Sequence, residues 1–133
     1  MGDRRKFPRI KTSNLISHVT IDESGRWISQ GMSRALDISQ SGIMLETAYP
    51  LESGILSMMT VDVNNNLIEI QGELIYCHRS DSAMYHSGIR FFGTNDQVTQ
   101  FITNIIKVYV HRKNRLYIVQ SNIRLSTISS SLN

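Results

Sequence analysis

The chain has 133 residues and a mass of 15.2 kDa, which fits one domain and leaves too little chain for two independent cores. Hydrophobic residues make up 41% and charged residues 19% of the sequence, which excludes a chain disordered throughout. No apolar run approaches the ~20 residues of a membrane helix, and a single cysteine, Cys77, excludes an internal disulfide. With no secretory signal pattern at its start, the chain is expected to be cytoplasmic, without membrane insertion, metal or cofactor.

The basic residues are unevenly distributed. The chain carries 14 basic and 11 acidic residues, a net charge of +3. A basic arm on a nearly neutral body indicates an anionic ligand, nucleic acid or a membrane surface, and the alternative is a solubilising tail. Five of the cations lie close together at the N-terminus: Arg4, Arg5, Lys6, Arg9 and Lys11.

Six segments between positions 15 and 92 have the pattern of β-strands. In 15–21, residues of β-branched and polar type alternate with period two, and the turn-forming residues 22–25 follow. Short strands separated by hairpin-like breaks predict a mainly β fold, a closed six-stranded antiparallel barrel. The other five strands are expected over 26–36, 43–46, 55–63, 68–76 and 85–92.

The hydrophobic period changes after position 92. Apolar residues at helical spacing predict an α-helix that begins after Thr94 or Asn95 as the N-cap and covers one mouth or flank of the barrel. Past position 114 either the helix continues or a short extended segment forms over 116–119. The Ser/Thr-rich tail from Ser126 is expected to be disordered. We therefore divide the chain into a basic arm (1–12), a barrel with its helix (13–112) and a partly disordered C-terminal extension (113–133). The apolar helical positions are Val98, Phe101, Ile102, Ile105 and Tyr109.

The sequence shows no residue pattern that is typical of an enzyme active site. No close ligand spacing links the histidines, no acidic pair stands out, and no glycine-rich phosphate loop precedes the helix. We identify no catalytic residue and no metal ligand set, and we expect the protein not to be an enzyme. The four histidines are His18, His78, His86 and His111.

Two short motifs stand out when they are taken together. The first is an RxxxR spacing formed by Arg5 and Arg9, preceded by Arg4, in which Pro8 prevents a plain helix. The second, residues 37–42, places the carboxylate of Asp37 and a hydroxyl two residues apart at the end of a strand, and a glycine follows that permits a sharp return. Each motif is common by itself, whereas their order and separation are specific.

The pair of motifs resembles the PilZ domain, the receptor domain for the bacterial second messenger cyclic di-GMP, over roughly residues 4–110. That family carries RxxxR in an N-terminal loop and then (D/N)xSxxG on a six-stranded barrel, and no motif position departs from the pattern here. Segments 7–10 and 87–91 are also similar to the family. The resemblance implies a PilZ-type barrel with a C-terminal helix and cyclic di-GMP as its ligand. It implies these ligand-binding residues: Arg4, Arg5, Arg9, Asp37, Ser39, Gly42 and Gly88.

The residue types suit this ligand. An arginine fork meets guanine O6 and N7 and also suits a phosphate, while Asp37 can accept from the guanine N1–H and amine. Gly42 leaves room for the base or serves the backbone return. In the family, an arginine before RxxxR accompanies an intercalated ligand dimer, so Arg4 implies two molecules of cyclic di-GMP per chain.

The implied function is that of a bacterial receptor and adaptor. Because clustered cations repel one another, the arm should be mobile when empty and ordered when the ligand neutralises it. The protein would then signal through an unidentified downstream protein. The alternatives are a small barrel that binds single-stranded nucleic acid, for which Trp27 beside Arg26 is a meagre candidate, and a degenerate PilZ module that binds no ligand.

Overall fold

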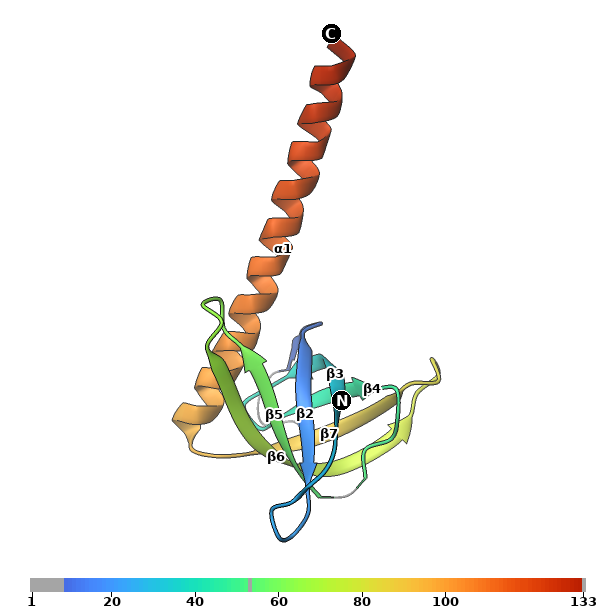
Figure 1. The fold of residues 1–133 in the computed structure, drawn as a ribbon, viewed down its shortest axis with the longest axis vertical. Coiled ribbons are helices and arrows are strands. Elements are labelled where there is room, and N and C mark those ends of the chain that lie inside the picture. Colours follow the sequence, from blue (N-terminus) through green and yellow to red (C-terminus); the bar gives the residue numbers. More distant parts are fainter. Residues whose placement is uncertain (1–8, 53, 133) are drawn as a thin grey trace, which may run out of the picture.

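The computed structural model of the chain describes residues 9–52 and 54–132, with side chains as far as position 113. Seven strands are followed by one long helix (Figure 1). The elements are β1 (Ile10–Lys11), β2 (Leu15–Ile21), β3 (Trp27–Ile38), β4 (Gly42–Thr47), β5 (Ile55–Val61), β6 (Leu67–Arg79), β7 (Tyr85–Phe92) and α1 (Asn95–Leu132).

Strands β2 to β7 form a closed barrel, as predicted. The strands follow one another around the wall in the order β3-β2-β5-β6-β7-β4, and β4 pairs again with β3 to close it. Every pairing is antiparallel. The short strand β1 lies outside this ring and pairs only with the end of β3. Closure removes the exposed sheet edges that an open sheet of this size would have, except along 27–33, where β3 extends past its pairing with β4.

The barrel core is formed by the apolar residues that alternate along the strands. Ile16, Ala35, Ile43 and Leu45 are fully buried, whereas the apolar residues beside them, Leu15, Leu36 and Met44, are more exposed. Such alternation places every second side chain inside the barrel, where burial of apolar surface stabilises the fold. The largest fully buried side chain, Phe101, comes from α1 and not from a strand.

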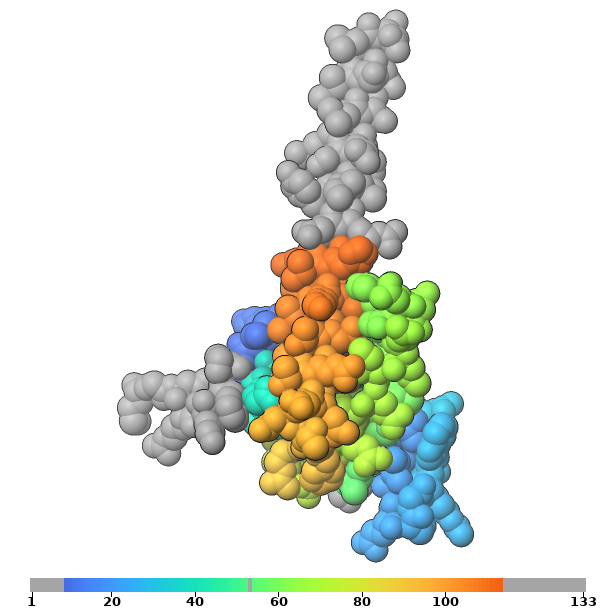
Figure 2. Space-filling view, turned by 90° about the vertical axis from the view of Figure 1, so that its left-hand side faces the viewer, coloured from blue at the N-terminus to red at the C-terminus, as the bar shows by residue number. Residues whose placement is uncertain are grey.

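Helix α1 covers one flank of the barrel (Figure 2). Thr94 is its N-cap, because Gln97 N–H donates to Thr94 Oγ1 and the Gln97 side chain accepts from Thr94 N–H, which forms a capping box. Val98, Phe101 and Ile105 are buried in the barrel core. Asn14 adds a polar contact by donating to the carbonyl of Ile105 at 3.1 Å. The predicted helix and its role as a cover are therefore confirmed.

Several element limits differ from the prediction. Strand β5 ends at Val61 because the Asp62 carboxylate accepts hydrogen bonds from the backbone of the following turn, whereas the predicted strand continued to Val63. Strands β3 and β6 end later than expected, at Ile38 and Arg79, and β1 was not expected.

The structure decides between the continued helix and the extended segment that the sequence allows past position 114. The helix runs to Leu132, so the extended segment over 116–119 is wrong. The helix includes residues 126–132. The disorder expected for the tail from Ser126 stays a prediction. The division of the chain into an arm, a barrel with its helix and a C-terminal extension stays a prediction as well. Among the residues that the structure describes, no helix is both long and apolar enough to cross a membrane.

One titratable ring is part of the barrel wall. His18 on β2 is 5% exposed, and its Nδ1 lies 3.3 Å from Ser33 Oγ. Burial lowers the pKa of His18, because the protonated ring would lose its hydration. The folded protein therefore holds this ring neutral at a pH where the unfolded chain already binds a proton.

The stability of the protein should consequently fall as the pH drops below about 6.5, the ordinary pKa of histidine. Carboxylates with lowered pKa, such as Asp22 and Glu46, lose their contribution only below about pH 4, outside this window. We expect His18→Gln to flatten the dependence of Tm on pH between about 7 and about 5. Equal slopes for the variant and the parent would show that His18 is not the group responsible.

Candidate functional site

The two sequence motifs meet at the end of β3. The Arg9 guanidinium forms an ion pair through Nε with Asp37 Oδ1, and its Nη1 donates to Ser39 Oγ at 3.2 Å. The side chains of Arg9 and Asp37 are 17% and 20% exposed, so a ligand can reach both. A cation, a carboxylate and a hydroxyl thus form one polar cluster from residues that are 28 to 30 positions apart.

Backbone pairing brings this cluster together. In β1, Ile10 pairs with Ile38 and Lys11 with Asp37, which sets Arg9 directly beyond the end of β3. The next residue, Thr12, continues the contact, because its N–H donates to the carbonyl of Leu36 at 3.0 Å. Ile10 is 45% exposed, so the arm is attached by its main chain and not by burial of this side chain.

The turn between β3 and β4 is held by its own polar groups. Ser39 N–H donates to the carbonyl of Gly42 at 2.9 Å. Ser39 Oγ accepts from the N–H of Ser41 at 3.3 Å and lies 3.0 Å from Ser41 Oγ. The hydroxyl that contacts Arg9 is therefore also a structural part of the turn, and its position does not depend on a ligand.

Both glycines of the candidate site stand where strands approach each other closely. A Cβ at Gly42 would lie 2.1 Å from the carbonyl oxygen of Ile89 on β7. A Cβ at Gly88 would lie 2.3 Å from the ring of Tyr76 on β6. Of the two roles considered for Gly42, the geometry supports the backbone role, because any side chain there would meet the main chain of β7.

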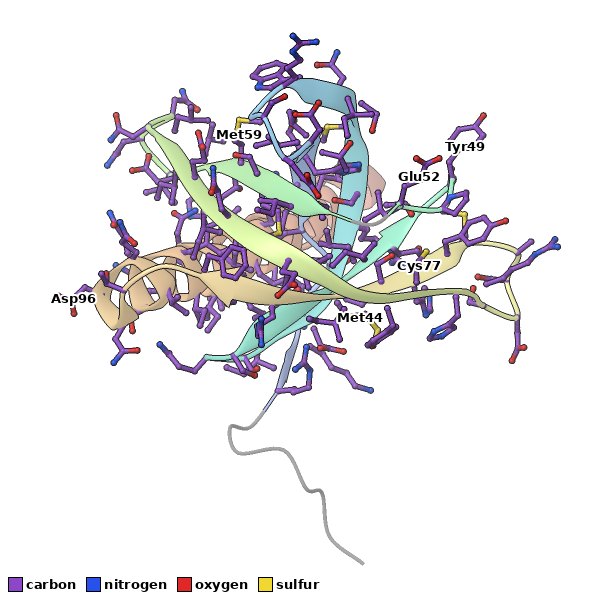
Figure 3. All side chains as sticks on the ribbon, turned by 90° about the horizontal axis from the view of Figure 1, so that it is seen from below. Met44, Tyr49, Glu52, Met59, Cys77 and Asp96 are labelled. Atoms are coloured by element: carbon purple, nitrogen blue, oxygen red, sulfur yellow. The ribbon has the colours of Figure 1, made fainter. Side chains whose placement is uncertain are left out.

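A cavity of about 340 Å³ opens beside the cluster. Arg9 is on its wall together with both glycines, and the aromatic ring of Tyr76 is 42% exposed. Met44, labelled in Figure 3, also lines it. The cavity thus combines a guanidinium, an accessible aromatic ring and two glycine surfaces, a combination that suits a flat, anionic ligand such as a nucleotide.

Two other arginines in this region are already paired with acids. Arg90, which lines the cavity, forms an ion pair with Glu73, and Arg34 lies 2.7 Å from Glu46. The pKa of Glu46 is lowered, first by the hydrogen bond from His86 and then by Arg34. Both arginines, like Arg9, are therefore paired with a carboxylate, but only Arg9 is paired with the carboxylate of the motif and also donates to its hydroxyl.

The sequence motifs therefore locate most of this site. The structure brings Arg9, Asp37 and Ser39 into contact and places Gly42 and Gly88 in one cavity wall. Arg4 and Arg5 lie outside the described residues. Sequence analysis assigned no role in the site to Tyr76 or Arg90. Arg90 stands in the segment 87–91 that is similar to the family, whereas Tyr76 is the last residue of the predicted strand 68–76, where it alternates with polar residues.

Replacement of Gly42 tests whether it serves the fold. We expect Gly42→Ala to lower the free energy of unfolding by about 1–3 kcal/mol, because the new methyl group forces β4 and β7 apart. Chemical denaturation without ligand measures this, and Gln71→Ala at an exposed position on β6 is the control. An unchanged stability for Gly42→Ala would return Gly42 to a role in making room for the ligand.

Comparison with known proteins agrees with this geometry. The sequence model of the PilZ domain matches residues 3–107. No curated protein matches the chain.

Solved structures share the fold at low sequence identity. The PilZ domain with c-di-GMP of YcgR from Escherichia coli superposes with a TM-score of 0.59 at 16% identity, covering 86% of this chain and 98% of that one. The K. pneumonia MrkH–c-di-GMP complex gives 0.58 at 16% identity, with coverage of 86% and 55%. The Bacillus subtilis inhibitor of motility, MotI/DgrA, gives 0.56 at 12% identity, with coverage of 85% and 52%. The chain thus spans about half the length of MrkH and MotI.

Proposed function

The chain belongs to the PilZ domain family, and on that premise we propose that it is a receptor for cyclic di-GMP. The observation that carries the proposal is the convergence of Asp37 and Ser39 on Arg9, which lines the neighbouring cavity. Two similar structures, YcgR and MrkH, are complexes with c-di-GMP. The family consists of receptor domains and not of enzymes, so the chain is not an enzyme.

The polar cluster has the chemistry that a guanine needs. A guanidinium can present a planar pair of N–H donors to O6 and N7, and it can stack on the purine plane. The second carboxylate oxygen of Asp37 can accept from guanine N1–H and the amine while Oδ1 holds Arg9. The existing ion pair orients Arg9 before the ligand arrives, so less side-chain entropy is lost on binding.

We further propose that the ligand orders the arm and that a partner protein recognises the result. Arg4, Arg5 and Arg9 bring three positive charges close together in sequence, and two bridging phosphates would neutralise much of their repulsion. Pairing of Ile10 and Lys11 with β3 fixes the point from which the arm starts. The ligand would thus join arm and barrel into a new surface.

Arg9 should be essential for binding. Each charge-assisted hydrogen bond contributes roughly 1.5–3 kcal/mol, so Arg9→Ala should weaken binding of cyclic di-GMP by at least about tenfold in calorimetry. Arg26→Ala removes the same charge from an exposed position on the β2–β3 turn and should change the affinity little at moderate salt. Equal affinities for Arg9→Ala and the parent would refute this assignment of the motif.

Arg4 should set the stoichiometry. A second, intercalated ligand needs a further guanidinium to meet its outer guanine and its charge, so we expect two molecules of cyclic di-GMP per chain. Arg4→Leu should lower the molar ratio toward one and reduce the remaining affinity less than Arg9→Ala does. A merely long-range effect, screened over about 10 Å at 0.1 M salt, would lower affinity with salt dependence and leave the ratio unchanged. A ratio of one for the parent chain at saturation would contradict the hypothesis.

One observation favours a second candidate, a barrel that binds single-stranded nucleic acid. Trp27 is 70% exposed beside Arg26, as a base-stacking residue would be. Titration of the same protein with a single-stranded oligonucleotide separates the two functions: the proposed receptor should bind the dinucleotide and not the oligonucleotide.

A further inference from the structure

Strand β3 has an open edge along its first half. Residues 27–34 pair with β2 on one side, whereas β4 pairs with β3 only from Arg34 to Ile38 on the other side. Within the described part of the chain, no strand pairs with 27–33 on the β4 side. The backbone N–H and C=O groups on that side are therefore available to an added strand. The β2–β3 hairpin that carries this edge stands out from the body of the molecule (light blue in Figure 2).

The two sides of β3 are paired to different extents. Where β2 ends its pairing at Arg34, the two residues of β1 take over the same side of β3 and pair with Asp37 and Ile38. Only residues 12–14 separate this segment from β2, and Thr12 and Asn14 also bond to β3, so β1 and β2 together cover one side of β3 over its whole length. The position in line with β4, beside 27–33, is the vacancy on the other side of β3.

A cavity of about 550 Å³ lies in this vacancy. One wall is β3 itself, from Ile28 to Met32, and the other is the segment from Thr47 to Glu52 that follows β4. Figure 3 shows Tyr49 and Glu52 on that segment. The cavity is larger than the one beside Arg9, and none of the residues that line it lines the other cavity.

The cavity reaches the buried imidazole of His18, and only one of its two ring nitrogens has a hydrogen-bond partner among the described residues. His18 is 5% exposed and lines the cavity, and Nδ1 is its only ring atom with a hydrogen-bond partner among the described residues. Gly31, its neighbour across the ladder, leaves the ring uncovered, since a Cβ there would lie 3.3 Å from His18 Nε2. Nε2 therefore faces a space in which a peptide group or a small polar side chain can meet it.

The rim of the cavity is apolar with one acid. Ile28, Met32 and Tyr49 are 59%, 58% and 81% exposed, although side chains of this kind are usually buried. Among the lining residues, Glu52 alone carries a charged side chain while His18 is neutral. A complementary segment would be apolar at alternate positions and would carry a lysine or arginine opposite Glu52.

We propose that the open edge of β3 is a docking site for an extended segment of a partner protein, which adds as a strand antiparallel to β3 and in line with β4. Main-chain hydrogen bonds to 27–33 supply affinity, and every second side chain of the segment enters the cavity over Gly31. The basic side chain beside Glu52 fixes the direction of the segment. The site takes an apolar, basic-flanked β-strand peptide.

The docking site itself does not depend on the proposed adaptor function. Only the interpretation of the docked segment as part of a signalling partner rests on that proposal. Its test contains no cyclic di-GMP and uses the whole chain, so failure of peptide binding and failure of ligand binding are separate results. The probe is a pool of short random peptides displayed on phage, selected against the purified protein and then synthesised. The single tryptophan, Trp27, begins the open edge and provides a fluorescence signal for titration.

We expect selected peptides to alternate apolar residues, to contain a lysine or arginine, and to slow amide hydrogen exchange in 27–33. A strand uses every second N–H toward its neighbour. N-methylation of one alternate set of peptide residues should therefore abolish binding, while methylation of the other set should leave it largely intact. Ile28→Lys should weaken binding at least tenfold. Val63→Lys is the matched control, because Val63 is similarly exposed, at 56%, and does not line the cavity.

Four results would overturn the proposal. The selection could yield no peptide, the two N-methylated forms could bind alike, or Ile28→Lys and Val63→Lys could have equal effects. The fourth is self-association of the parent chain in light scattering that Ile28→Lys abolishes, which would assign the edge to a second copy of the chain. Gly31→Val, which fills the space over His18, supplies a second variant and should also lose binding, provided that it retains the Tm of the parent.

Discussion

Strand β3 holds the structure together because it pairs with three other strands along different parts of its length. Its first half forms a ladder with β2, and its second half lies between β1 and β4. The β3–β4 pairing closes the barrel, and closure in turn buries Ile38 and Ile43 where the two strands meet. Without this shared strand the sheet would stay open, and the buried apolar face of α1 would have no core to cover.

The position of the candidate site follows from the same strand. Asp37 and Ser39 stand where β3 ends and the chain turns into β4, and β1 brings Arg9 to that point by main-chain pairing. The side chains of Arg9 and Asp37 are only 17% and 20% exposed, and the loss of hydration offsets much of the attraction between two charges buried to this extent, so the cluster is better suited to recognition than to holding the fold. Gly42, three residues after Ser39 and the first residue of β4, acts on the barrel itself through its close approach to Ile89.

Much of this architecture is predictable from the sequence, because strands and helix differ in their hydrophobic period. Period two over 15–21 and 85–92 predicts strands whose limits agree with β2 and β7, and the spacing of Val98, Phe101 and Ile105 predicts the buried helix face. The motif spacing also predicts the site, since a carboxylate and a hydroxyl two residues apart share one side of an extended chain.

The hydrophobic period of a strand does not determine its register or the strands with which it pairs. Two residues, Ile10 and Lys11, are too few to show alternation, so β1 cannot be predicted from the sequence and is identified only by its pairing with β3. Tyr76 has the pattern of a core residue, but its register opposite Gly88 leaves its ring over a glycine at the cavity. The open edge of 27–33 is missed for the same reason, because a strand looks alike in sequence whether one or both of its sides are paired.

The candidate ligand site and the open edge lie at opposite ends of β3, which constrains how one could influence the other. A ligand changes the affinity of a second site only through a difference between two states of the protein, and the effect is reciprocal. Strand β3 is paired from Trp27 to Ile38, first with β2 and then with β4. Each of these two pairings contains one irregularity, and the one in the pairing with β4 lies between Ala35 and Asp37. The second irregularity adjoins Asp37, so a change in the Arg9–Asp37 pair would act first on a part of β3 whose pairing is already irregular. A change that travels along β3 from Asp37 to 27–33 would therefore cross this bulge before it reached the open edge.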